Sequence, residues 1–428
     1  MNLQLITDSL KNCPCGRSHT CEISGIWIES GLVRKTGSLL KENGFPMNIL
    51  VVADKNTLSA STGILESLER AGFSVTLKLY DDLKEANMKD VELLLTLTQD
   101  VEGILSVGTG SLNDICRLAA YRADLPLVIF ATAPSMDGFA SGTTPIVTNG
   151  FKETHQARQP KFILADTRIL AAAPAELKSA GFGDIIAKYT ALCDWRISHL
   201  LTGEYYCEQI ADLTRQAISR VTAMADQITK EDETAAGMVM KALVLTGIAM
   251  NYAKSVRPAS GAEHIVAHFW EIKKLEKGLA SDFHGKKVGV ATVFLSELYH
   301  SLASVEEIHS CTDQTDWGRV YAAYGKNFET DIRRLNSPTV TDEVNPVDLQ
   351  KNWENIRRII FEEVPKPETL LTLMKQAGAV TNADGIDVSE ELCVAGMQYH
   401  AYMRYRLTLC RLVPMLGIPV VWREHRLF

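Results

Sequence analysis

The sequence has no excess of positive charge. Its 44 Lys and Arg residues face 52 Asp and Glu residues, which gives a formal net charge of -8 at pH 7. A chain of this composition offers no extended basic field to hold nucleic acid or an anionic membrane surface. We therefore expect no nucleic-acid partner, and an anionic substrate would need a local group of cations.

Long uninterrupted apolar runs are also missing. The first residues, MNLQLITDSLKNCPCGRSHT, do not combine a basic stretch, an apolar run and a small-residue cleavage site as a secretory signal does. The longest apolar stretch, residues 238–254, is interrupted by Lys241 and Asn251. It falls short of the about 20 clean residues that cross a bilayer. We expect no membrane span.

Cysteine occurs without a pairing pattern. The nine cysteines are an odd number, scattered from Cys13 to Cys410, which suits free thiols in a reducing cytoplasm. Cys13-x-Cys15-x-x-x-His19, followed by Cys21, looks like a metal-binding segment. Its spacing is tighter than the usual knuckle, and no matching second half is evident. We expect a surface-anchored N-terminal loop there rather than a metal site.

The first part of the chain alternates between strand and helix patterns. With 428 residues, 46% of them hydrophobic, the chain suits a globular protein of about two domains. Short aliphatic runs predict strands, and periodic segments between them predict helices. The predicted strands are residues 47–54, 73–80, 103–108 and 125–134. Strands that alternate with helices predict a doubly wound parallel sheet.

The pattern changes after Pro134. Asn149-Gly150 lies between two polar-apolar segments, as in the turn of a β-hairpin. From about Asp166 onward almost every segment has helical periodicity. We therefore predict an α/β N-terminal domain over residues 1–170 and an all-helical C-terminal domain over residues 171–428.

Two polar loops follow neighbouring predicted strands. The first, residues 108–114 (GTGSLND), ends a strand and opens a helix, where glycines and free N–H groups can receive a pyrophosphate. It departs from G-x-G-x-x-G at Asn113, and a plain strand-to-helix turn is the alternative. The second, residues 131–138 (ATAPSMDG), offers hydroxyls at Thr132 and Ser135 and a carboxylate at Asp137. Since ligands of such sheets bind beyond the strand ends, the two loops together favour one nucleotide site over two unrelated turns.

A third group of segments carries side chains that can bind metal. They are residues 181–184 (GFGD), 260–264 (SGAEH) and 282–285 (DFHG). One carboxylate and two imidazoles from separate segments would give a three-ligand site with an open position. His264 and His268 share a helix face, as in zincins, but Ile265 stands where those enzymes carry their glutamate, which rules against a zincin. Spacing alone does not select the ligands among ten histidines.

Taken together, the motifs GTGSLNDI, TAPSMDGFASG, GFGDIIAKYTALCDW, RPASGAEH and FHG resemble the sn-glycerol-1-phosphate dehydrogenase family, particularly its bacterial branch. That family is related to glycerol dehydrogenase, iron-type alcohol dehydrogenase and 3-dehydroquinate synthase. The resemblance covers about residues 48–290 and implies the dehydroquinate synthase-like, iron-type alcohol dehydrogenase-like fold. Beyond residue 300 only the helical pattern supports it.

The resemblance also assigns roles to residues. It implies that Asp184, His264 and His284 bind the metal and that Asp137, Asp184 and His268 contact the substrate, with Asp184 and His268 catalytic. Asp54 would meet the adenosine ribose, where a carboxylate favours NAD over NADP. One departure is Thr109, where many relatives carry glycine. The implied cofactor contacts are Asp54, Gly108, Gly110, Ser111, Leu112, Asn113, Asp114, Thr132, Ala133, Pro134, Ser135 and Ser141.

The implied activity is a metal-dependent, NAD(H)-linked interconversion of dihydroxyacetone phosphate and sn-glycerol 1-phosphate, with NADP possible as the cofactor. The family resemblance implies a homodimer that serves phospholipid metabolism, with zinc or nickel as its metal, although Asp and His ligands suit several metals. Arg257 and Lys188 are candidates for binding the substrate phosphate. Two alternatives remain: a dehydrogenase of an unphosphorylated polyol such as glycerol, and a 3-dehydroquinate synthase-like carbon–oxygen lyase.

Overall fold

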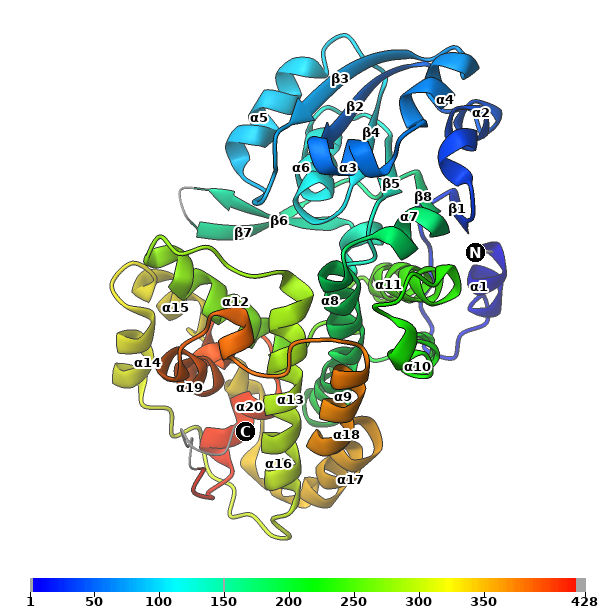
Figure 1. The fold of residues 1–428 in the computed structure, drawn as a ribbon. Coiled ribbons are helices and arrows are strands. Elements are labelled where there is room, and N and C mark those ends of the chain that lie inside the picture. The colour runs from blue at the N-terminus through cyan, green and yellow to red at the C-terminus, as the bar shows by residue number, and fades with distance from the viewer. Residues whose placement is uncertain (1–2, 149–150, 421–428) are drawn as a thin grey trace.

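A six-stranded parallel sheet forms the N-terminal part of the computed structural model, which describes residues 3–148 and 151–420 (Figure 1). The strand order is β1-β8-β5-β4-β2-β3, and every neighbouring pair is parallel. The strands are β1 (Gly25–Glu29), β2 (Asn48–Asp54), β3 (Ser74–Tyr80), β4 (Gly103–Gly108), β5 (Leu127–Ala131) and β8 (Phe162–Asp166).

Both faces of the sheet are covered by helices. Alternate residues of each strand enter two separate cores, as the two-residue period of a strand requires. Val51 and Leu105 pack with α2 (Thr36–Glu42) and α4 (Ile64–Ala71), whereas Val52 and Ile104 pack with α5 (Met88–Leu97) and α6 (Gly110–Arg122). This arrangement confirms the predicted doubly wound sheet.

The sheet has two strands more than the four predicted ones, which are β2 to β5. β1 has only five residues, and only two of them are buried, so its apolar signal is weak. β8 is fully buried, but it directly follows the polar hairpin, so the sequence pattern did not predict it as a separate strand. The hairpin itself is present, with β6 (Thr143–Thr148) antiparallel to β7 (Phe151–Gln156). Its predicted turn, Asn149-Gly150, lies outside the described residues.

After β8 the chain is helical throughout the described residues up to 420, as the sequence predicts. A separate apolar core unites α12, α13 and the helices that follow. The helices that position the site are α8 (Ala175–Ile186), α9 (Lys188–Thr202), α12 (Ala262–Glu276) and α13 (His284–Ala303). The others are α1 (Leu3–Ser9), α3 (Lys55–Ala60), α7 (Thr167–Ala172), α10 (Glu208–Thr222), α11 (Glu233–Ala253), α14 (Trp317–Tyr324), α15 (Glu329–Leu335), α16 (Pro346–Lys351), α17 (Trp353–Glu363), α18 (Pro367–Gln376), α19 (Glu390–Tyr399) and α20 (Leu409–Leu412).

One described helix, α11, is long and apolar enough to cross a membrane by length and composition. However, 72% of its most apolar stretch is buried inside the protein. Figure 1 shows α11 between α10 and the sheet, and its residues share a core with β1 and α8. The helix therefore occupies the position of a core helix.

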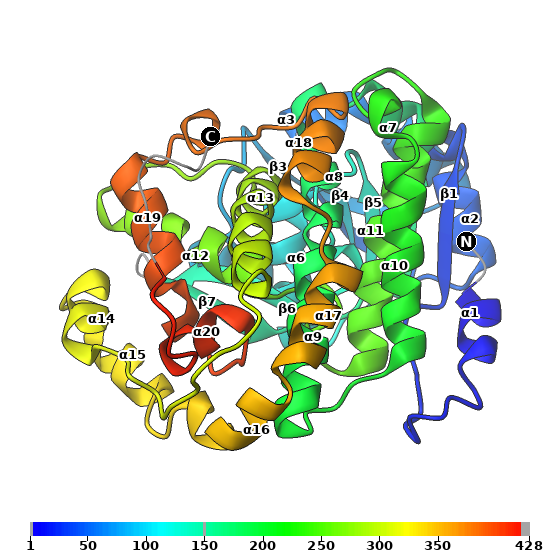
Figure 2. The same ribbon diagram turned by 90° about the horizontal axis from the view of Figure 1, so that it is seen from below.

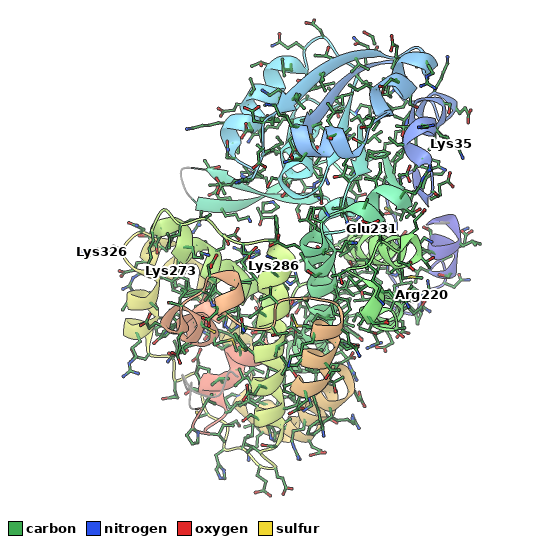
Figure 3. The ribbon with its side chains drawn as sticks, viewed as in Figure 1. Lys35, Arg220, Glu231, Lys273, Lys286 and Lys326 are labelled. Carbon is green, nitrogen blue, oxygen red and sulfur yellow. The ribbon has the colours of Figure 1, made fainter. Side chains whose placement is uncertain are left out.

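Helix α8 lies in direct backbone contact with both of its neighbours. A Cβ atom at Gly181 would collide with the carbonyl oxygen of Pro134 in the loop after β5. A Cβ atom at Gly183 would collide with the carbonyl oxygen of Gly285 in α13. Lys286 of α13, labelled in Figure 3, also pairs with Glu176 of α8. Glycine is needed here because any side chain would push these elements apart.

We expect Gly181→Ala to lower the free energy of unfolding by about 1–3 kcal/mol, since the added methyl group has no space in this contact. Gly318→Ala is the matched control, because its Cβ would meet only Asp316 Oδ1, at 3.3 Å, on an exposed helix. That control should leave stability unchanged or raise it by up to about 1 kcal/mol. Denaturant unfolding of both variants measures the difference, and equal stabilities would contradict the argument.

Candidate active site

The predicted nucleotide loops lie side by side at the carboxyl edge of the sheet. β2, β4 and β5 are neighbours in the sheet, and Ala53 pairs with Val107 at the ends of β2 and β4. The chain runs outward from β2 to β3 and then returns to β4, so the winding direction reverses between β2 and β4. Open α/β sheets bind their ligands at such a switch point.

The turn between β4 and α6 has the geometry of a phosphate loop. Gly110 has φ +46°, in the left-handed region that favours glycine. Thr109 has φ -146°, an extended conformation that any residue adopts, so the departure at Thr109 costs nothing. Thr109 Oγ1 lies 2.7 Å from Ser135 Oγ, which joins this turn to the loop after β5. The N–H groups at the start of α6 are suited to an anion.

Several of the predicted cofactor contacts use their side chains within the protein. Asn113 Oδ1 accepts a hydrogen bond from Ser106 Oγ at 2.8 Å. The Asp114 carboxylate pairs with Arg117 and accepts from Thr144 Oγ1 at 2.9 Å. These side chains fix α6 against β4 and the hairpin. Internal bonds of the same kind hold Ser111, whose Oγ donates to Lys84 O, and Ser141, whose Oγ donates to Thr143 O. Gly108, Leu112, Thr132, Ala133 and Pro134 line the same two loops.

Asp54 begins helix α3. Its Oδ1 accepts a hydrogen bond from Thr57 N at 2.8 Å, and Thr57 Oγ1 accepts one from Asp54 N at 3.0 Å. This capping box by itself explains an acidic residue here. The carboxylate nevertheless lies at the switch point, beside the β4–α6 turn.

Three potential metal ligands converge from three helices. They are Asp184 in α8, His264 in α12 and His284 at the start of α13, and their ligand atoms all lie within 4.8 Å of one another. His264 Nε2 lies 3.6 Å from Asp184 Oδ1. Burial and the nearby His264 lower the pKa of His284 well below its ordinary value, which favours the neutral imidazole that binds metal. One carboxylate and two imidazoles fit a divalent cation with open positions.

Glu263 orients one of these ligands, a role that the sequence did not reveal. Its Oε1 lies 2.8 Å from His264 Nδ1. Burial alone would raise the pKa of Glu263, but hydrogen bonds from His264 and Thr190 lower it, so the group is a carboxylate. A carboxylate that accepts from Nδ1 leaves Nε2 free to coordinate. The only sequence signal was the glutamate directly before the histidine.

A buried ammonium group joins the loop after β5 to the cluster of Asp184, His264 and His284, the three potential metal ligands. Lys188 Nζ lies 2.6 Å from both Asp137 Oδ2 and Asp184 Oδ1. Burial alone would lower the pKa of Lys188, but the two carboxylates raise it above its ordinary value, so the lysine is charged. Asp184 Oδ2 also accepts from Asp137 N at 2.9 Å. Asp137 is thus held next to the metal ligands, where the resemblance implied a substrate contact.

The structure does not support the two residues named for the substrate phosphate. Lys188 is engaged by Asp137 and Asp184. Arg257 donates to both carboxylate oxygens of Glu204, at 2.9 and 2.6 Å, and to Leu407 O at 2.8 Å. The Arg257 guanidinium group therefore holds segments of the helical part together.

Other cations, which the sequence did not reveal, lie beside the metal cluster. Lys152 of the hairpin bonds Glu271 of α12 at 2.9 Å, and Lys287 of α13 lies 3.4 Å from the same carboxylate oxygen. Both lysines act electrostatically on His284, and Arg404 acts on His268. Lys152 and Lys287 thus share the single carboxylate of Glu271, and Arg404 adds its charge near His268. They come from three distant segments, so spacing could not indicate them.

His268 lies near the metal cluster but outside the set of mutually close ligand atoms. Its ring centroid is 6.4 Å from that of His264 and 5.8 Å from that of His284. Burial, together with the charge of Arg404, lowers the pKa of His268 well below its ordinary value, so the imidazole is neutral. Its position suits contact with a molecule bound at the cluster.

The sequence of the chain is similar to those of known dehydrogenases. The family model described as iron-containing alcohol dehydrogenase matches residues 27–174. A glycerol-1-phosphate dehydrogenase (NAD(P)+) from Halalkalibacterium halodurans is 33% identical, over 93% of this chain and 94% of its own. The protein of that name from Geobacillus stearothermophilus is 29% identical, over 91% and 92%. One from Methanosarcina barkeri is 36% identical, over 64% and 76%.

Solved structures share the fold. The alcohol dehydrogenase from an archaeal halo-thermophilic Red Sea brine pool aligns with a TM-score of 0.61 at 15% identity, over 95% of this chain and 96% of its own. The glycerol dehydrogenase from Schizosaccharomyces pombe aligns with a TM-score of 0.55 at 17% identity, over 92% and 96%. The predicted fold class is confirmed.

We expect Glu263→Gln to weaken divalent-metal binding about 10–100-fold, because the amide no longer holds His264 in the required tautomer. Glu276→Gln is the control and should bind metal normally, because Glu276 lies at the far end of the same helix, where it pairs with Lys273 and accepts from Asn327 Nδ2. Competition against a chelator of known affinity measures both. Unchanged affinity in Glu263→Gln would remove this residue from the site.

Proposed function

We propose, because this chain belongs to the glycerol-1-phosphate dehydrogenase family, that it is a metal-dependent, NAD(P)-linked oxidoreductase that interconverts dihydroxyacetone phosphate and sn-glycerol 1-phosphate. One observation carries the proposal. Asp137, in the loop after β5, bonds both Asp184 and Lys188, so the nucleotide edge of the sheet adjoins a three-ligand metal cluster. A hydride donor and a carbonyl-binding metal need that adjacency.

The bound groups supply the redox chemistry. A divalent ion held by Asp184, His264 and His284 would polarise a carbonyl oxygen, and the nicotinamide would exchange hydride. The chain itself orients the reactants. Lys188 keeps the carboxylates of Asp137 and Asp184 in fixed positions, so that Asp137 can accept hydrogen bonds from substrate hydroxyls.

We assign proton transfer to His268. A neutral imidazole can accept a proton at one ring nitrogen while releasing one from the other, which is the property of a relay. The ring stacks on that of His284 at 29° and lies one helical turn from His264. From there it can reach an oxygen of a substrate bound at the cluster.

We assign the substrate phosphate to the cations beside the proposed metal site, Lys152 and Lys287 at Glu271 and Arg404 near His268. Lys152 and Lys287 share one carboxylate within ion-pair distance, and burial makes an incompletely compensated positive charge costly. A phosphate group would supply the missing negative charge through charge-assisted hydrogen bonds. An unphosphorylated polyol would leave this surplus without a partner, which favours the phosphorylated substrate over glycerol.

Further assignments complete the proposal. The two strand-end loops would hold the pyrophosphate, and Asp54 would meet the ribose 2′-hydroxyl through the carboxylate oxygen not used in its capping bond, which favours NAD over NADP. Zinc or nickel is the metal that we propose, in a homodimeric cytoplasmic enzyme. We also propose that the chain divides into an α/β domain of residues 1–170 and a helical domain of residues 171–428.

The reaction is tested by following NADH oxidation with dihydroxyacetone phosphate, with unphosphorylated dihydroxyacetone and without substrate. We expect turnover only with the phosphorylated ketone, loss of turnover after chelation, and recovery when metal is restored. Preference for the unphosphorylated ketone would favour a polyol dehydrogenase. Turnover of a lyase substrate with catalytic NAD and no net redox change would favour the 3-dehydroquinate synthase-like alternative.

The roles of the three histidines are separable. His264→Ala and His284→Ala should each remove a metal ligand and empty the site. His268→Ala should keep its metal but lose about 10²–10⁴-fold in kcat, the typical contribution of a proton-transfer residue. Elemental analysis beside turnover for each variant decides between the roles. Metal loss in His268→Ala with retention in His284→Ala would reverse the assignment.

Substrate binding should weaken at alkaline pH. Burial and the neighbouring Lys152 lower the pKa of Lys287 to about 8, against the opposing effect of Glu271. The ammonium is charged below that pH, whereas a substrate phosphate stays dianionic above about pH 6. The KM for dihydroxyacetone phosphate should therefore rise as the pH increases through about 8. Lys287→Met should raise KM about 10–100-fold at neutral pH, the equivalent of one charge-assisted hydrogen bond.

Lys287→Arg is the control, since its guanidinium stays charged and should flatten the pH dependence. A KM that rises identically in the wild type and in Lys287→Met would assign the effect to another group.

A further inference from the structure

A second cluster of potential metal ligands lies apart from the active site. Cys13, Cys15, His19 and Cys207 bring one ligand atom each to within 4.8 Å of all the others. The sequence pattern suggested no second half for the N-terminal cysteines and predicted only a surface loop. The structure supplies the missing ligand from the residue directly before α10, and it buries both His19 and Cys207.

The distances suit a small tetrahedral cation. Cys13 Sγ lies 3.4 Å from Cys207 Sγ, and Cys15 Sγ lies 3.2 Å from His19 Nε2. With Zn–S bonds of about 2.3 Å and Zn–N bonds of about 2.0–2.1 Å, tetrahedral ligand atoms stand about 3.5–3.8 Å apart. A small expansion of the cluster would accept the ion. Three cysteines and one histidine form a common structural zinc set.

The groups around the cluster are arranged for metal binding. His19 Nδ1 lies 3.1 Å from the backbone oxygen of Tyr252, so that carbonyl accepts its N–H and leaves Nε2 facing the sulfur atoms. The Tyr205 hydroxyl donates to Cys15 Sγ at 3.4 Å, which favours a thiolate. The Arg17 guanidinium stands 3.6 Å from the centre of the Tyr205 ring and adds positive charge nearby.

A disulfide explains less of this geometry. A bond between Cys13 and Cys207 would use two of the four side chains and give no reason for Cys15 and His19 to face each other. Cys21 shows the contrast, because its Sγ turns to Gln159 Oε1 at 3.9 Å although it is only two residues from His19. The convergence therefore selects four particular side chains rather than any nearby thiol.

We propose that Cys13, Cys15, His19 and Cys207 bind one structural zinc ion. Four protein ligands complete the tetrahedron and leave no position for a substrate, unlike the three-ligand active site. The ion fastens the segment between α1 and β1 to the start of α10 and the end of α11. Thr7 Oγ1 lies 2.6 Å from the hydroxyl oxygen of Tyr252 on the same surface, and Figure 2 shows α1 close to α10 and α11. Zinc thus anchors the N-terminal edge of the sheet to the helical part.

Metal analysis of the full chain, purified under reducing conditions, tests the proposal. We expect Cys207→Ser and Cys13→Ser each to contain one zinc ion per chain fewer than the wild type and to melt at a lower temperature. Cys21→Ser is the matched control and should keep the wild-type metal content. His284→Ala should retain the structural zinc, which separates this site from the catalytic metal and from the proposed function.

A measurement on the wild-type chain covers the case in which the cysteine variants do not fold. Replacement of zinc by Co²⁺ should give the intense near-ultraviolet sulfur-to-cobalt absorption of a thiolate site, which Asp and His ligands cannot produce. Absence of that absorption in chains that take up Co²⁺, or equal zinc content in Cys207→Ser and Cys21→Ser, would overturn the proposal. So would an intact mass and peptide map showing a Cys13–Cys207 disulfide in chains without zinc.

Discussion

The direct backbone contacts of helix α8 are the constraint on which the site depends. Gly181 lets the helix touch the loop after β5, and Gly183 lets it touch the start of α13. Asp184 follows these glycines at once, so its carboxylate enters the space between the nucleotide loops and His284. If larger side chains separated these elements, Asp137 N could no longer donate to Asp184, and the hydride donor would stand away from the metal ligands.

The local charge at the site differs from the net charge of the whole chain. The chain as a whole is acidic, yet its site sets Lys188 between two carboxylates and gathers further lysines around Glu271. The first arrangement is neutralised within the protein and fixes geometry. The second sets two lysines against one carboxylate, and it is the place where we propose that the substrate phosphate binds. The net charge of the chain could not describe this local binding chemistry.

The sequence predicted those features that depend on neighbouring residues. Aliphatic runs gave β2 to β5, and the polar loops after β4 and β5 indicated the nucleotide edge, because strand ends and turns have local signatures. β1 escaped because its burial alternates over only five residues. Lys152 and Cys207 have their partners on distant segments, which sequence spacing cannot predict. Glu263 lies directly before His264, but the sequence alone did not show that its carboxylate bonds the imidazole. The choice of His264 and His284 among the histidines needed the family resemblance.

The contact between Cys13 and Cys207 also orders events while the chain is being made. The two sulfur atoms lie 3.4 Å apart although 194 positions separate them along the chain. At about 5–20 residues per second, a ribosome takes roughly 10–40 s to deliver the second cysteine after the first. During that interval the N-terminal thiols lack their native neighbour, and the proposed zinc site requires them to stay reduced. A cell that makes this protein must therefore keep a nascent, thiol-bearing N-terminus unreacted until the middle of the chain arrives.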